Sequence, residues 1–355
     1  MQAPGAVPEP RERRKYSVAH VRRHWYIACP SAELKQKPKA VTILDTPLVL
    51  FRQNGQASAL LDRCAHRNVP LSLGYVEADR LVCGYHGWEF DGHGVCQQVP
   101  ALCGVQTGKA RRVPAYPTRE QAGYVWVYLD PETQPAVEPF TFPELDNPAY
   151  TTVRYEASFK ATLHASLENI LDVPHTAFLH RGLFRGVKRN EITAVVRRRS
   201  DRVEAEFLGE PRPTGVVGNI LAPQGGTVTH FDRFFLPSIA QVEYRLGDKN
   251  HLTISNALTP VSDFETKLYT VITFRTIIPP LLLRPILTPI GKRILAQDQV
   301  MLEQQTRSVQ RFDGEQYAST DVDLLGPHIW RLLKDAERGT APSDEVHEER
   351  VQLLA

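Results

Sequence analysis

The sequence predicts an α+β protein with an all-β N-terminal domain, followed by a domain in which a curved antiparallel sheet wraps around a long helix. Three observations support this fold class. Short runs of β-branched and aromatic residues alternate with turn residues in the first third of the chain. Several longer strand-like runs follow between residues 151 and 277. The apolar spacing then predicts a long amphipathic helix at about 289–311 and a shorter one at about 326–338.

Length and composition indicate two globular domains. The chain has 355 residues, of which 42% are hydrophobic and 23% charged, and this length fits about two domains. We expect a flexible arm at 1–20, a first domain at 21–135 and a second at 136–355, because the stretch after the first domain is rich in proline and acids. The net charge of +2 gives no reason to expect nucleic acid. The arm lacks the apolar core of a secretory signal, so the cytoplasm is the expected location.

The elements of the first domain are short strands and turns. The runs at 40–52, 58–62 and 124–130 predict antiparallel strands. Gly84 and Gly87 allow tight turns, in which backbone N–H groups can point at a bound group.

Two Cys–His pairs dominate this domain. Cys64 and His66 form a Cys-x-His pair, and Cys83 and His86 form a Cys-x-x-His pair. Sixteen residues separate the two pairs. Zinc fingers place their cysteines together and their histidines together, whereas here each cysteine is followed by a histidine. This order lets two cysteines hold one iron and two histidines the other, in a [2Fe–2S] centre of the Rieske type. A structural zinc ribbon is the alternative.

The remaining cysteines do not suggest a disulfide framework. Cys29, Cys96 and Cys103 are odd in number and have no regular spacing, so we expect free thiols.

The second domain carries a second group of candidate ligands. Asn169, Asp172 and His175 are three residues apart and would share one face of a helix expected over 164–180. His180 lies five residues after His175, so a helix that bends or ends near Pro174 could bring both imidazoles to one metal. The alternative is two buried histidines that only form hydrogen bonds.

A third ligand is expected on the long helix. Asp298 lies within an apolar face formed by Ile294, Leu295, Met301, Leu302 and Val309. A carboxylate facing a core is costly unless it is paired or binds a cation. Two histidines and one carboxylate form the facial triad of non-haem Fe(II) oxygenases. A salt bridge to Arg275 is the alternative, and Glu303 and Asp313 are weaker candidates for the carboxylate ligand.

The segment at 276–295 is apolar but contains four prolines and three basic residues. It is too interrupted to form a regular membrane-spanning helix. Three interpretations stay open: a loop packed on the core, a lid over a substrate channel, or a peripheral contact with a membrane.

With both motifs in place, the chain resembles the oxygenase (alpha) subunit of the Rieske non-haem iron oxygenases over residues 20–310. The resemblance implies a Rieske domain and a helix-grip-like catalytic domain. It also implies a role for each matching residue: cluster ligands Cys64, His66, Cys83 and His86; cluster surroundings Trp88 and Arg67; mononuclear iron ligands His175, His180 and Asp298; and, in the shared motif, Asn169 and Asp172, the latter bridging to the cluster of a neighbouring subunit. A head-to-tail homotrimer follows from that bridge.

The expected function is that of a terminal oxygenase. It would use O₂ and electrons from a separate reductase, directly or through a ferredoxin, because the chain contains no flavin or nicotinamide fingerprint. We expect a monooxygenase that hydroxylates or oxidatively demethylates a hydrophobic substrate of the sterol, terpenoid or polycyclic kind. A ring-dihydroxylating dioxygenase and a non-catalytic Rieske electron-transfer protein are the alternatives.

Overall fold

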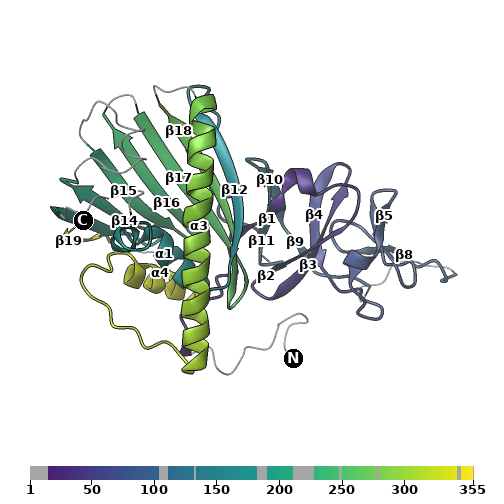
Figure 1. Ribbon diagram of the computed structural model, residues 1–355. Helices are drawn as coiled ribbons and strands as arrows, with labels where there is room; N and C mark the ends of the chain where they lie inside the picture. Colours follow the sequence, from purple (N-terminus) through teal and green to yellow (C-terminus); the bar gives the residue numbers. More distant parts are fainter. Residues whose placement is uncertain are drawn as a thin grey trace. The chain divides into compact units, whose positions relative to one another are not determined.

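The computed structural model describes residues 15–103, 111–131, 133–181, 190–210, 228–247, 250–276, 280–341 and 345–354. The chain divides into two compact units (Figure 1). The first unit contains Arg22–Thr141, and the second contains Phe142–Ala355 together with the segment that ends at Val21. Residues of the expected N-terminal arm contact the second unit, since the Ser17 N–H donates to Glu315 over 2.8 Å. Residues 1–14 of that arm lie outside the described residues.

The first unit is built from three small antiparallel sheets. Their strands are β1 (Trp25–Pro30), β11 (Tyr124–Tyr128) and β10 (Thr118–Gln121); β2 (Lys39–Ile43), β3 (Thr46–Gln53), β4 (Gln56–Leu61) and β9 (Ala115–Tyr116); and β5 (Tyr75–Glu77), β6 (Arg80–Val82), β7 (Glu89–Phe90) and β8 (Cys96–Gln98). Two short 3₁₀ helices, η2 (Ser31–Glu33) and η3 (Leu71–Leu73), connect them. The predicted all-β character of this unit is confirmed.

One predicted strand of this unit is in fact a hairpin. The run at 40–52 is divided by Leu44 and Asp45, whose φ angles are 48° and 56°. Two successive residues with positive φ form the kind of two-residue turn that matches the twist of a hairpin. Neither residue is the glycine or asparagine that usually indicates such a turn, so the sequence pattern did not reveal the break.

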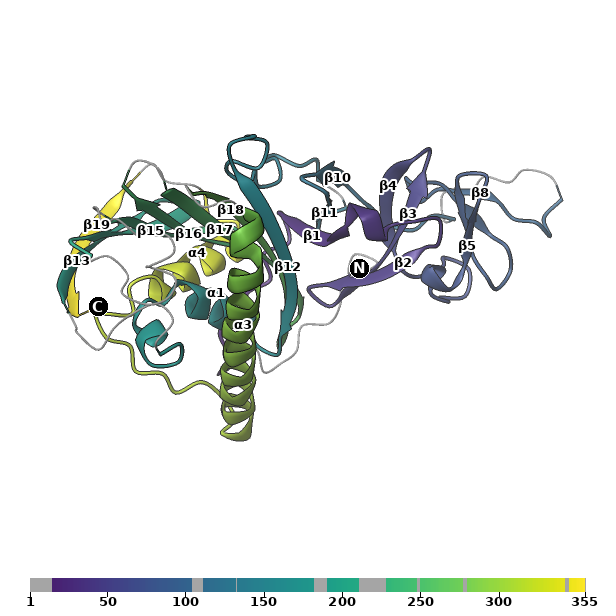
Figure 2. The same ribbon diagram turned by 45° about the horizontal axis from the view of Figure 1, so that its top comes forward.

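The second unit contains an eight-stranded antiparallel sheet in the order β12–β18–β17–β16–β15–β14–β13–β19. Its strands are β12 (Thr151–Phe159), β13 (Glu191–Arg198), β14 (Arg202–Leu208), β15 (Val228–Phe235), β16 (Ile239–Leu246), β17 (Asn250–Ser262), β18 (Glu265–Arg275) and β19 (His347–Leu354). The sheet is curved, and helices lie within its curve (Figure 2). The predicted α+β architecture is therefore confirmed.

The described residues of this unit also form three α-helices: α1 (Leu163–Leu171), α3 (Pro280–Arg311) and α4 (Gly326–Arg338). α1 packs on the central strands β15–β18, α4 packs on α1 and β14, and α3 runs along β12. The short helix predicted at 326–338 is confirmed, and Gly339 ends it in the left-handed conformation. The core between helices and sheet contains buried residues such as Leu167, Ile329 and Phe234.

The long helix begins earlier than the sequence indicated. α3 starts at Pro280 instead of about 289, so the loop interpretation is wrong for residues 280–295. Proline at the first helical position loses no intrahelical hydrogen bond, because that N–H has no partner in a helix. Pro285 and Pro289 each remove one internal donor, and the helix continues through both. In the described part of the chain, no helix is both long and apolar enough to cross a membrane.

Strand β19 was not predicted. Its sequence is rich in charged residues, which are depleted in strands, and most of its side chains are exposed at the edge of the sheet. Pairing with β13 places Arg197 beside Glu348, with 2.9 Å between guanidinium and carboxylate. Arg197 also lies 2.8 Å from Glu206.

Candidate functional site

The two Cys–His loops of the first unit share one backbone fold. The N–H of Asn68 donates to the Cys64 carbonyl and the N–H of Gly87 to the Cys83 carbonyl, both over 3.0 Å. The Cys64 N–H donates to the Val69 carbonyl over 2.9 Å, and the Cys83 N–H donates to the Trp88 carbonyl over 2.8 Å. Asn68 and Gly87 have positive φ angles of 61° and 69°. The loops are therefore two copies of one ligand-presenting turn.

Like side chains meet across these loops. The Cys64 and Cys83 thiols are buried and within hydrogen-bond reach of each other. The His66 and His86 rings lie 4.5 Å apart between centroids. Trp88 stacks on His66 at 4.7 Å with an interplanar angle of 3°. Two sulfurs on one side and two imidazoles on the other match the division that a Rieske cluster requires.

The protonation properties of these groups fit metal binding. Burial, with a contribution from Cys83, raises the pKa of Cys64 to about 11, although the His66 and Arg67 N–H groups donate to its sulfur. Metal ions displace such protons when they bind. Burial, His86 and Arg67 lower the pKa of His66, which favours the neutral imidazole that binds metals. His66 Nδ1 is buried without a hydrogen-bond partner, and metal ligation would satisfy it.

Among the described residues, no disulfide involves the other three cysteines, in agreement with the prediction. Cys29 and Cys96 are buried, and Cys103 is exposed.

The second set of ligands starts where α1 ends. The Thr162 side chain caps the start of α1 by accepting the Ala165 N–H over 3.1 Å. The helix ends at Leu171, because Asp172 has extended backbone angles of −91° and 104°. A short 3₁₀ helix, η4 (Pro174–Ala177), then begins with the proline. The predicted single helix over 164–180 is therefore wrong, whereas the predicted break near Pro174 is confirmed.

This break brings two imidazoles together with the carboxylate of α3. His175 Nε2 lies 3.3 Å from His180 Nε2. Asp298 Oδ1 lies 3.1 Å from His180 Nε2 and 3.8 Å from His175 Nε2. The three ligand atoms all lie within 4.8 Å of one another. One metal ion could bind all three, and the structure unites three residues that the sequence proposed from separate segments.

Neighbouring groups orient both imidazoles. His175 Nδ1 donates to the Asp172 carbonyl, and His180 Nδ1 donates to Gln297 Oε1 over 3.0 Å. These hydrogen bonds leave the Nε2 lone pairs directed at the shared centre. Burial lowers the pKa of His180, but Asp298 and Gln297 outweigh burial and raise it.

Asp298 is buried, and its Oδ1 atom accepts no hydrogen bond. A buried carboxylate oxygen without a donor is costly unless a cation binds it. The alternative ligands have other contacts: Glu303 pairs with Arg307 at 2.6 Å, and Asp313 pairs with Lys15. Arg275, the alternative salt-bridge partner of Asp298, lies over the ring of Tyr150.

The apolar face predicted around Asp298 needs one correction. Leu302 is buried, but Met301 is 51% exposed. The two residues are neighbours in the chain, so they point about 100° apart on a helix.

A cavity of about 230 Å³ adjoins His175, His180 and Asp298. Strands β15–β18 supply one wall through side chains of the same sheet face, among them Val242, Ile254 and Ile272. Most of the wall is apolar, as in most small-molecule sites.

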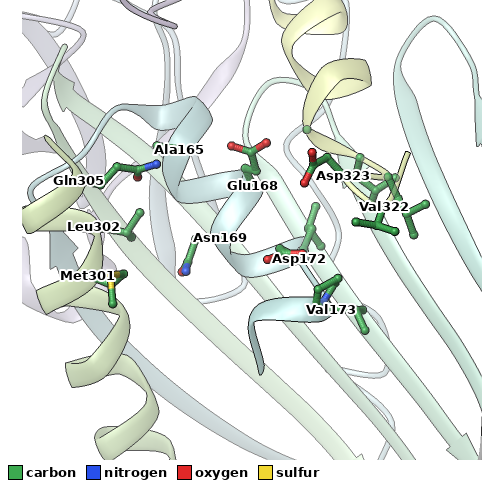
Figure 3. A pocket seen from close by; sticks show the side chains of 15 residues that line it. Ala165, Glu168, Asn169, Asp172, Val173, Met301, Leu302, Gln305, Val322 and Asp323 are labelled. Atoms are coloured by element: carbon green, nitrogen blue, oxygen red, sulfur yellow. The ribbon is translucent and has the colours of Figure 1, made fainter. Parts of the chain in front are cut away.

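Asp172 and Asn169 line this cavity and also a second hollow of about 300 Å³, whose lining side chains are drawn in Figure 3. Glu168 and Asp323 lie in that hollow (Figure 3). Burial, together with Asp323 and Asp172, raises the pKa of Glu168. Asp172 thus lines both the cavity of the candidate metal centre and the acidic hollow.

Sequence reasoning missed the polar end of the cavity. His230 and Asp232 line it from β15, and Glu210 contacts His230 from behind. Two polar residues at alternate positions of an aromatic-rich strand are a signal that polar groups occupy an otherwise apolar face. The alternation of polar and aromatic residues does not tell which face of the strand is buried. Glu210 lies 20 residues before His230 in the sequence.

His230 is expected to make stability depend on pH. Burial lowers its pKa, but Asp232 and Glu210 outweigh burial and raise the pKa from 6.5 to about 9. The resulting stabilisation is fully present below pH 6.5 and is lost as the pH rises through 9, with a total of about 3 kcal/mol. Chemical denaturation at pH 6.5 and 9.5 should show this loss for the wild type and not for His230→Gln. An exposed histidine, His93→Gln, serves as the control, and equal losses in wild type and His230→Gln would contradict the prediction.

Comparisons with known proteins agree with this geometry. Residues 24–117 match the family model of the Rieske [2Fe-2S] domain, and residues 159–338 match that of the vanillate O-demethylase oxygenase C-terminal domain. The second match alone covers half of the chain. The chain belongs to the Rieske non-haem iron oxygenases. The predicted family and fold class are confirmed, and the comparisons support both predicted cofactors, a [2Fe–2S] cluster and a mononuclear iron.

Two relatives and one solved structure illustrate the likeness. The oxygenase component of dicamba O-demethylase from Stenotrophomonas maltophilia is 37% identical over 168 residues, which are 46% of this chain and 49% of the relative. Methylxanthine N1-demethylase from Pseudomonas putida is 35% identical over 170 residues, 46% of this chain and 48% of the relative. The matches thus span about half the length of these curated relatives. The crystal structure of dicamba monooxygenase bound to dicamba superposes with a TM-score of 0.75 at 25% identity, covering 90% of this chain and 98% of that chain.

Proposed function

We propose that this Rieske oxygenase is a terminal monooxygenase that hydroxylates or oxidatively demethylates a compact organic substrate. The observation that supports this most is the group of His175, His180 and Asp298 beside an apolar cavity. Three protein ligands leave further coordination positions open for O₂, in the manner of a facial triad.

The donor sets fit the two cofactors. Cys64, His66, Cys83 and His86 would hold the cluster, with Trp88 stacked on one ligand and Arg67 beside it. Asp298 Oδ1 and His66 Nδ1 are two of the buried side-chain atoms that lack a hydrogen-bond partner among the described residues, and each would gain one as a ligand. When bound, the cluster supplies single electrons and the ferrous ion activates O₂.

The remaining residues would prepare the site. The Asp172 carbonyl and Gln297 fix the tautomers of both histidine ligands. The apolar wall would exclude water from a substrate whose C–H bond lies beside the three candidate ligands. The Asn169 side chain lies between the two hollows, where its buried, unpaired Oδ1 could accept a hydrogen bond.

Electrons would come from a separate reductase, directly or through a ferredoxin. We further propose a head-to-tail homotrimer, in which the cluster of a neighbouring subunit approaches Asp172. The support is the position of Asp172, which lines both the metal cavity and the acidic hollow.

The cavity favours a smaller substrate than a sterol. Within the described residues it measures about 230 Å³, below the usual ~300–1,000 Å³ of ligand pockets. The relatives named above act on dicamba and on methylxanthines. We therefore propose a methylated molecule of one or two rings as substrate.

The function is tested with iron-loaded protein, a ferredoxin–reductase pair and ¹⁸O₂, using anisole and N-methylated heterocycles as probes. Demethylation of an ether ROCH₃ consumes O₂, two electrons and two protons, and yields ROH, formaldehyde and water. We expect formaldehyde, which carries one ¹⁸O per turnover if it is trapped before its oxygen exchanges with water. Two ¹⁸O atoms retained in a cis-diol would indicate a dioxygenase. If no probe gives a product and His175→Ala leaves electron transfer through the protein unchanged, the protein is an electron-transfer protein.

A further inference from the structure

The metal cavity has a charged end formed by Glu210, His230 and Asp232. His230 Nδ1 lies 2.6 Å from Glu210 Oε2, and His230 Nε2 lies 3.1 Å from Asp232 Oδ1. The three side chains are 5%, 1% and 2% exposed. Of the three, His230 and Asp232 line the cavity itself.

The geometry determines the protonation of this triad. A histidine can satisfy carboxylates at both ring nitrogens only when both nitrogens carry protons. Phe207 and Tyr244 stack on the two faces of the imidazole, with centroids 4.5 and 4.1 Å away, and hold the ring in the plane of these contacts. The raised pKa of His230 agrees with an imidazolium at neutral pH. Both of its donors are then used within the triad.

What the triad can offer to a bound molecule is therefore acceptor oxygens. An ionised carboxylate such as Asp232 accepts hydrogen bonds and donates none. The described residues that line the cavity include no lysine or arginine. Another polar pair on the wall, Asn256 and Thr270, is neutral, with the Thr270 hydroxyl donating to Asn256 over 2.7 Å. A carboxylate on a substrate would meet like charge here without a basic partner from these residues.

We propose that the Glu210–His230–Asp232 triad determines substrate specificity by selecting molecules with a protonated amine or an N–H donor over molecules with a carboxylate. The inference rests on the proposed function in that it takes this cavity as the substrate site. Asp232 is the recognition group, and His230 and Glu210 position it and keep it ionised.

The test is a binding measurement with two matched probes, benzylamine, which is protonated at neutral pH, and benzoate. Isothermal titration calorimetry is performed on the iron- and cluster-loaded protein, without O₂ or reductant, so that no turnover is needed. We expect the wild type to bind benzylamine at least about tenfold more tightly than benzoate. Asp232→Asn, which keeps the shape and removes the charge, should lower this ratio by about tenfold or more.

Two controls make the result specific. Glu303→Gln removes a partly exposed acid outside the cavity and should leave the ratio unchanged. Ile254→Trp fills the cavity and should weaken both probes. If Asp232→Asn fails to fold, Glu210→Gln replaces it, and the preference of the wild type is decisive by itself.

Equal binding, tighter binding of benzoate, no binding of either probe, or a ratio unaffected by Asp232→Asn would overturn the inference. A protein that binds benzylamine preferentially but oxidises nothing would refute the proposed function and leave the inference intact.

Discussion

Replacing Asp298 with alanine is expected to remove the mononuclear iron, lower turnover by more than ~100-fold and leave the Rieske spectrum unchanged. Losing only a hydrogen-bond partner of a metal ligand commonly costs ~10–100-fold, and this change removes the ligand itself. The effect should be confined to the second unit, because Asp298 contacts His175 and His180 there.

Iron analysis, visible absorption and product formation measure the three quantities. Glu303→Ala is the matched control, since Glu303 lies on the same helix, is partly exposed and pairs with Arg307. Full iron content and normal turnover in Asp298→Ala would exclude this carboxylate as a ligand. Loss of both iron centres would instead indicate a folding defect.

Replacing Asp172 with asparagine is expected to retain both iron centres while slowing turnover by about 100-fold. Its carbonyl, which orients His175, remains, whereas the charge between the metal cavity and the acidic hollow is lost. The prediction separates a role in electron delivery from a role in metal binding.

The rate at which the reduced cluster is oxidised by O₂ in the presence of substrate checks this prediction. Asp323→Asn, in the same hollow but outside the metal cavity, serves as the control and should slow the reaction by no more than a few fold. Iron loss from Asp172→Asn, or oxidation of the cluster at the wild-type rate, would contradict the proposed role.

Local sequence patterns were sufficient for the strands of the second unit other than β19 and for helix α4, because their apolar residues follow a regular period. These patterns were insufficient where one or two residues determine whether a helix or strand continues or ends. Pro174 divided a predicted helix, Leu44 and Asp45 divided a predicted strand, and Pro285 did not divide α3.

The ligand residues could be chosen from the sequence because their types and spacing restrict the chemistry. Cys64 and His86, for example, belong to a pattern that few metal centres accept. The Glu210–His230–Asp232 triad could not be found in this way. His230 and Asp232 are two residues apart on β15, whereas Glu210 follows β14 and reaches His230 because β14 pairs with β15, with Phe207 opposite His230 in the register.

The central claim is that this one chain holds two separate iron centres. The iron and acid-labile sulfide content of the wild type, Asp298→Ala and Cys83→Ser tests it most directly. We predict about three irons and two sulfides for the wild type, about two of each for Asp298→Ala, and about one iron without sulfide for Cys83→Ser. Zinc in place of iron and sulfide in the wild type, or variants that lose both centres together while remaining folded, would contradict the claim.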